Sequence, residues 1–222
     1  MGYWTYYLAM FFLSFALARP WVMVGAVVFF VLRPVLPDPW VLWSTMGKIR
    51  ALKGQIAVNS SNVTARRDLA RIYLARLQPR SALLLLDEAR VRHPDDAELL
   101  FLTGLARLRC GDAEGALSPL IRAVDVEPRL LYGEPFRIAA EALVKLGRLE
   151  EAEDALDRYV GINSSTVEGY TQLARVRQDR GDKEGASAAI EEALRTFAQL
   201  PGYQRRKQID WWLRAQYTRL MM

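Results

Sequence analysis

The side chains that most often act as nucleophiles, bases or metal ligands are scarce in this sequence. It contains a single cysteine, Cys110, and a single histidine, His93, which lie apart in the chain. Its adjacent carboxylates, such as Glu150 and Glu151, fall in segments where acids commonly solvate a helix or favour its N-terminus. The sequence has neither a glycine-rich phosphate loop nor metal-ligand spacing. It therefore predicts no enzyme, no metal site and no cofactor.

Charge is concentrated near the beginning of the chain. The formal net charge is +5, and most of it comes from the first 62 residues. That stretch holds five basic residues and one acid, namely Arg19, Arg33, Lys48, Arg50, Lys53 and Asp38. The rest of the chain is nearly balanced, so the basic character is local and predicts no nucleic-acid partner. A lone cysteine also excludes an internal disulfide.

Residues 97–128 show the organisation that the rest of the chain follows. Apolar residues recur every three to four positions on both sides of Gly111 and Asp112, which predicts two amphipathic helices joined by a tight turn. The small residues Gly104, Ala116 and Ala123 fall where two helices would approach closely. Pro128 closes the unit.

The same spacing of small residues recurs about every 34 positions. It defines four segments, 63–96, 97–130, 133–166 and 167–200, with a two-residue insertion before Gly133. The pattern resembles the tetratricopeptide repeat, a helix-turn-helix unit of 34 residues with small residues and a closing proline at these places. The resemblance implies an all-α fold, an α-solenoid of about four repeats.

In tetratricopeptide arrays the first helix of each repeat lines a concave groove. The resemblance therefore implies a groove that is basic at its near end, apolar in the second repeat and mixed beyond. The candidate partner-binding residues are Arg67, Arg71, Phe101, Leu105, Arg109, Arg137, Lys145 and Arg175. Cations beside an apolar patch would suit an acidic or amphipathic peptide segment. The alternative is that these side chains are simply solvated helix faces.

Residues 1–45 are predicted to anchor the chain in a membrane. Residues 3–32 are almost entirely apolar, and a bilayer-spanning helix needs about 20 such residues. The segment lacks the basic start of a cleavable signal peptide. Arg19 and Pro20 divide it, which leaves two alternatives open: a single membrane helix or a short helical hairpin. The residues assigned to the anchor and its interfaces are Trp4, Tyr7, Arg19, Trp21, Trp40 and Trp43.

Residues 46–62 are predicted to form a basic juxtamembrane helix and linker, with the helix over 48–58. Lys48, Arg50 and Lys53 follow the anchor closely, and positive residues favour the cytoplasmic side. We therefore expect a bacterial inner-membrane protein with its repeats in the cytoplasm. The alternative, an inverted anchor, would place the repeats in the periplasm.

Residues 201–222 are predicted to form a helix that caps the open end of the array. One face, which is mostly apolar, is expected to pack on the last repeat: Ile209, Trp212, Leu213, Gln216, Tyr217 and Leu220. The competing interpretation docks Trp211, Trp212 and the basic residues 205–207 on a membrane surface or a partner.

Two functional hypotheses follow. The first is a non-catalytic, membrane-anchored scaffold that serves as a subunit or assembly factor of a larger membrane protein complex, in contact with its other subunits and with the lipid bilayer. The anchor's two apolar arms and the charge of Arg19 favour it, because a plain tether needs one uncharged span. The second is a tethered receptor that recruits a soluble client through the groove.

Overall fold

A computed structural model describes residues 21, 24 and 39–221, and within these residues the only regular elements are helices. They are α3 (Pro39–Val58), α4 (Val63–Ala75), α5 (Pro79–Arg90), α6 (Ala97–Arg109), α7 (Ala113–Val126), the 3-10 turn η1 (Leu130–Gly133), α8 (Glu134–Lys145), α9 (Leu149–Ile162), α10 (Val167–Asp179), α11 (Lys183–Gln199) and α12 (Gly202–Met221).

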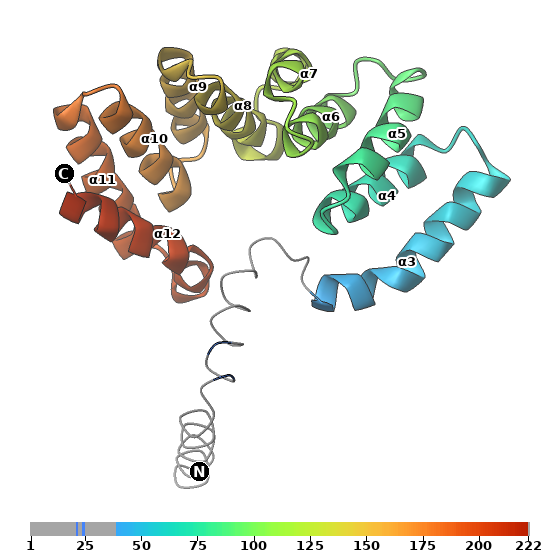
Figure 1. Ribbon diagram of the computed structural model, residues 1–222, viewed down its shortest axis with the longest axis horizontal. Helices are drawn as coiled ribbons and strands as arrows, with labels where there is room; N and C mark the ends of the chain where they lie inside the picture. The colour runs from blue at the N-terminus through green and yellow to red at the C-terminus, as the bar shows by residue number, and fades with distance from the viewer. Residues whose placement is uncertain (1–20, 22–23, 25–38, 222) are drawn as a thin grey trace, which may run out of the picture.

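The helices form an arch, as Figure 1 shows. Successive helices α4 to α11 pack as antiparallel pairs, and each pair packs on the next. The first helices of the pairs, such as α6 and α8, lie on the inner side of the arch, and the second helices, such as α7 and α9, lie outside. The expectation of an all-α solenoid is confirmed. Helices α4, α6 and α10 begin at the residues taken as the first positions of three predicted repeats.

Local signals explain where the helices begin and end. The side chains of Asn62, Asp96, Asp112, Thr166 and Asp182 cap the N-termini of α4, α6, α7, α10 and α11 by accepting a backbone N–H three residues later. At the turns inside three of the pairs the chain reverses at a glycine with positive φ, namely Gly111, Gly147 and Gly181. Only glycine adopts that conformation without steric cost.

The core is narrow because small residues line the helix contacts. Ala116 and Ala123 are fully buried, and Gly104 lies against Leu120 of α7 with no room for a Cβ atom. The predicted close approach of α6 and α7 is therefore present. Side chains of leucine, isoleucine and valine fill the spaces between these contacts along the whole array.

The two-residue insertion lies in η1, between the second and third helix pairs. Leu131 and Tyr132 both adopt left-handed backbone conformations, with φ of 48° and 59°, and Gly133 follows with φ of 82°. Three consecutive left-handed residues turn the chain sharply before α8 begins at Glu134. The insertion is thus absorbed in the connection and leaves the helices on either side regular.

The first described helix is longer than the sequence predicts. It begins at Pro39 and continues without a break to Val58, whereas a helix over 48–58 was expected. Proline suits the first turn of a helix because its missing N–H would have no helical partner there. No breaker follows before Gly47, so the helix also includes the mostly apolar residues 40–46.

The predicted membrane anchor lies largely outside the described residues. Among the residues that the structure describes, no helix combines the length and apolar character needed to cross a bilayer. Trp4, Tyr7 and Arg19 are outside the described part, so both the single helix and the hairpin stay predictions. Trp21, Trp40 and Trp43 are described, and all three side chains are exposed.

Candidate functional site

The inner groove, formed by α4, α6, α8 and α10, contains most of the predicted partner-binding residues. At the α4 end of the groove, two arginines contact a carboxylate of the next helix pair. Nη1 of Arg67 lies 2.8 Å from Oε2 of Glu98, and Arg71 pairs with the same carboxylate. Both arginines come from α4, whereas Glu98 belongs to α6. These ion pairs tie adjacent first helices together.

The arrangement repeats farther along the groove. Arg109 and Lys145 each lie 3.4 Å from Oε1 of Glu141, and Nη1 of Arg137 lies 3.1 Å from Oε1 of Glu168. Arg137 also pairs with Glu134 on its own helix. Arg175, near the far end, is exposed, and no ion pair from it is found within the described residues. Five of the six predicted cations are therefore matched by carboxylates.

Arg137 is the most enclosed cation of the groove. Burial opposes its charge, but the hydrogen bonds that Arg137 donates to Glu134 and the charges of Glu134 and Glu168 outweigh burial and raise the pKa of Arg137. Burial raises the pKa of Glu168, although the charge of Arg137 opposes that shift. An acidic ligand would have to compete with carboxylates that already contact the groove cations. At the end of the groove that the sequence predicts to be basic, Arg67 and Arg71 are thus already paired with a carboxylate.

The apolar part of the groove also differs from the expectation. Phe101 is buried in the core, because α6 is enclosed by α4, α5, α7 and α8. It does not line the groove. Leu105 does, in an inner pocket of about 590 Å³ between α4, α6 and α8. Its other lining residues include Leu74, Ala75, Leu77, Arg109, Arg137 and Ile138.

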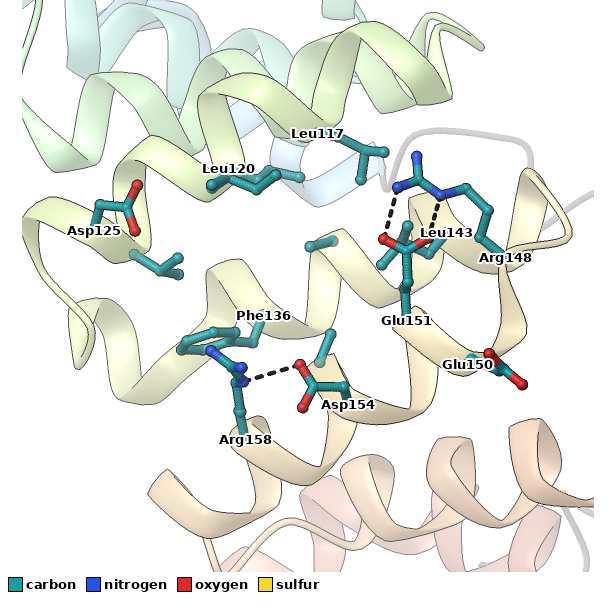
Figure 2. Close-up of a pocket in the computed structure, with 14 residues that line it drawn as sticks. Leu117, Leu120, Asp125, Phe136, Leu143, Arg148, Glu150, Glu151, Asp154 and Arg158 are labelled. Carbon is teal, nitrogen blue, oxygen red and sulfur yellow. Dashed lines mark hydrogen bonds and ion pairs between the residues drawn. The ribbon is translucent and has the colours of Figure 1, made fainter. Parts of the chain in front are cut away.

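A second cavity, the outer cleft, lies on the opposite side of the array and was not predicted from the sequence. It has a volume of about 480 Å³ and is bounded by α7 and α9, with α8 between them (Figure 2). Its floor is apolar, with Leu120, Phe136, Ala139 and Leu143. Ile121 of α7 also lines the cleft and is half exposed.

The rim of the outer cleft is charged and mostly paired. Arg148 forms two hydrogen bonds of 2.6 Å with Glu151, and Arg158 lies 3.0 Å from Asp154 (Figure 2). Glu150 pairs with Arg180 of the next helix pair. An apolar floor inside a polar rim is the usual composition of a protein-protein contact. The only sequence signal for this cleft is the run of apolar residues on α7. Helical periodicity alone assigns those residues to the core, so the cleft was not predicted.

The described part of the chain contains no group of three or more His, Cys, Asp or Glu side chains placed to hold a metal ion. Cys110 is exposed at the end of α6. The candidate sites that the described residues present are the inner pocket and the outer cleft between helices.

Comparison with known proteins agrees with this geometry. The sequence model of the tetratricopeptide repeat family matches residues 67–128, which span α4 to α7. A search of curated proteins finds no match. The fold is that of a tetratricopeptide-repeat solenoid.

Two solved structures illustrate the likeness. MamA is 20% identical, with a TM-score of 0.62, over 67% of this chain and 85% of its own. YrrB, described as "a TPR protein with an unusual peptide-binding site", is 18% identical, with a TM-score of 0.60, over 71% of this chain and 82% of its own. At these identities the likeness establishes the shared fold.

Proposed function

We propose that this protein is a non-catalytic, membrane-anchored scaffold that holds a protein partner, as a subunit or assembly factor of a membrane complex. The outer cleft is the observation that carries the proposal. Its apolar floor would receive apolar side chains of a partner, and its charged rim would set their register. Tetratricopeptide-type solenoids provide such surfaces along their whole length.

Sequence supports the membrane part of the proposal. The apolar stretch over residues 3–32 precedes a helix that carries exposed Trp40 and Trp43 and then the basic residues 48, 50 and 53. Aromatic side chains followed by cations are typical of the end of a membrane segment. The anchor would hold the array near the partner and raise its local concentration.

Purification of the full-length chain from its native membrane in mild detergent tests the proposal. We expect it to co-migrate with a stoichiometric membrane protein. Replacing Ile121 by Asp puts a charge in the outer cleft and should release that partner. The matched control is Val126→Asp on the same helix, since Val126 is about equally exposed, at 51% against 54%, but does not line the cleft. A chain that migrates alone, or a partner lost equally from both variants, would contradict the proposal.

A tethered peptide receptor is the second candidate, and the inner pocket favours it. Leu74, Leu105 and Ile138 give that pocket an apolar wall, while Arg109 and Arg137 supply cations at its edge. Because those cations already contact carboxylates, the pocket would favour an amphipathic segment over a purely acidic one.

Replacing one groove arginine separates the two candidates. Arg109→Ala removes an inner-pocket cation, and the similarly exposed Arg122 of α7, which pairs with Asp95, provides the matched control Arg122→Ala. Under the receptor hypothesis only Arg109→Ala weakens client capture, by up to about fivefold, because the Arg109 side chain is half exposed. Under the scaffold hypothesis neither variant changes the partner.

A further inference from the structure

The last helix, α12, is fixed against the array by one well-defined face. Ala215 is fully buried, and the ring of Trp212 stacks on Phe197 of α11 with centroids 5.4 Å apart. Oε1 of Gln208 accepts a hydrogen bond of 2.8 Å from the backbone N–H of Val167, the first residue of α10. These contacts determine which side of α12 faces away from the array.

The predicted packing face is therefore corrected. Trp212 packs as expected, but four of the other residues point outward. Ile209, Leu213, Tyr217 and Leu220 are between 47% and 84% exposed. With 3.6 residues per turn, positions 209, 213, 217 and 220 fall on one side of the helix. They form a continuous apolar band, which we call the outer stripe of α12.

An outer stripe of this kind is unusual at the end of a solenoid. Terminal helices normally present a polar outer surface, which keeps the array soluble. Contiguous exposed apolar residues instead mark contact sites. The helix that carries the stripe is also strongly basic, with one acid among five cations: Asp210 against Arg205, Arg206, Lys207, Arg214 and Arg219.

The charge on α12 narrows the choice of occupant. A second copy in a twofold dimer would place the same surface on both sides of the contact, so the cations would face each other. Charge complementarity instead favours an anionic partner. An apolar stripe with an aromatic residue and flanking cations also occurs on helices that lie at membrane interfaces.

We infer that the outer stripe of α12 lies on an anionic lipid surface, with Leu213 and Leu220 below the headgroups and Arg206 and Lys207 among them. The inference rests on the proposed membrane anchor, which would keep α12 within reach of the bilayer. In the view of Figure 1 both α3, which follows the anchor, and α12 lie on the concave side of the arch, at its two ends. The array would then be held to the membrane at a second point.

Lipid quenching in the full-length chain tests this inference. The background variant is Cys110→Ala, which removes the exposed native thiol. A polarity-sensitive fluorophore is attached to Leu213→Cys, or to the control Val91→Cys, which is also an exposed apolar position but lies between α5 and α6. Each protein is reconstituted into vesicles of phosphatidylglycerol and phosphatidylcholine that contain a nitroxide-labelled acyl chain, and floated on a density gradient.

We expect position 213 to be quenched roughly threefold more strongly than position 91, because interfacial helices bury their apolar face in the acyl boundary. Quenching should fall in pure phosphatidylcholine and in the double variant Arg206→Gln with Lys207→Gln, since each basic residue is attracted to anionic lipid.

The experiment distinguishes failure of the proposed lipid contact of α12 from failure of the proposed membrane anchor. If the chain floats with the vesicles but position 213 is quenched no more than position 91, the inference is wrong, the anchor stands, and the stripe belongs to a protein partner. If the chain does not float, the anchor and the inference both fail. Quenching that is equal in neutral and anionic vesicles would overturn the role given to the cations.

Discussion

At the scale of single residues, Gly104 shows how tightly the helix pairs are built. A Cβ atom added there would lie 2.5 Å from Cγ of Leu120, which is fully buried and cannot move away freely. We expect Gly104→Ala to destabilise the fold by about 1–3 kcal/mol through overpacking.

The control for that substitution is Gly161→Ala. Gly161 also lies in a helix, but a Cβ atom there would meet nothing within 4 Å. Alanine favours helix over glycine by about 1 kcal/mol, so this variant should be neutral or more stable. Urea unfolding followed by circular dichroism measures both changes. Equal effects at the two positions would contradict the packing argument.

Leu77 departs from the rule that the other turns obey. It occupies the turn position of the first pair that Gly111, Gly147 and Gly181 occupy in the others, and its φ is 57°. A left-handed conformation costs a residue with a Cβ atom about 1–2 kcal/mol, and glycine avoids that cost but loses more chain entropy.

We therefore expect Leu77→Gly to stabilise the protein by about 0.5–1 kcal/mol and the reverse change, Gly147→Leu, to destabilise it. Thermal unfolding of the two variants beside the parent chain provides the measurement. The prediction fails if Leu77→Gly lowers the melting temperature.

At the scale of elements, ion pairs join neighbouring helix pairs, and the best-defined set links α9 to α10. Glu153 lies 2.9 Å from Arg177 and also pairs with Arg180. Partial burial favours the neutral carboxyl, but the hydrogen bonds and charges of the two arginines outweigh burial. The pKa of Glu153 consequently lies below its ordinary value of 4.5.

The lowered pKa of Glu153 determines how its contribution to stability changes with pH. A carboxyl whose pKa is lower in the folded state contributes stability above its unfolded pKa and loses it as the pH falls through the folded value. Glu153→Gln should therefore cost about 1–2 kcal/mol at pH 7, and the cost should shrink below pH 4.5. Asp157 in the same set has the opposite effect on stability. Burial raises its pKa, so its ionisation disfavours the folded state as the pH rises.

Urea unfolding of the parent chain and the variant at pH 7 and pH 3.5 measures the difference. At each pH, the free energy of unfolding of the variant is subtracted from that of the parent chain. The contributions of the carboxyl groups that both proteins share then cancel. A stability difference that does not change with pH would show that Glu153 contributes through packing alone.

The sequence predicted the helix pairs but neither the ion pairs between them nor the outward face of α12. Periodic small residues identified the helix pairs, because Gly104 and Ala116 leave a direct trace in the spacing. The pairing of Arg67 with Glu98 left no local trace, since the two residues lie about one repeat apart. It could have been found by testing opposite charges at that offset. The outward face of α12 was missed because an apolar stripe does not reveal which side of a helix is covered.

At the scale of the whole molecule, the sequence predicts on which side of the membrane the helical array lies. If the basic residues 48, 50 and 53 hold the start of α3 at the cytoplasmic surface, both the single-helix and the hairpin anchor place the array in the cytoplasm. An array in the periplasm would require these cations to cross the bilayer, at about 2.5–3.5 kcal/mol for each residue at the centre. With the array in the cytoplasm, the basic helix α12 would face the cytoplasmic leaflet, which carries the negative surface potential.

Cys110 makes this prediction testable without a new reporter, because it is the only cysteine and its side chain is exposed. We expect a membrane-impermeant maleimide to leave the chain unlabelled in intact cells and to label it once the membrane is permeabilised. Ser60→Cys, in the exposed loop before α4, checks the result at a second point near the anchor. Labelling of either thiol in intact cells would place the array outside and reverse the orientation of the anchor. The lipid surface available to α12 would then be the opposite leaflet.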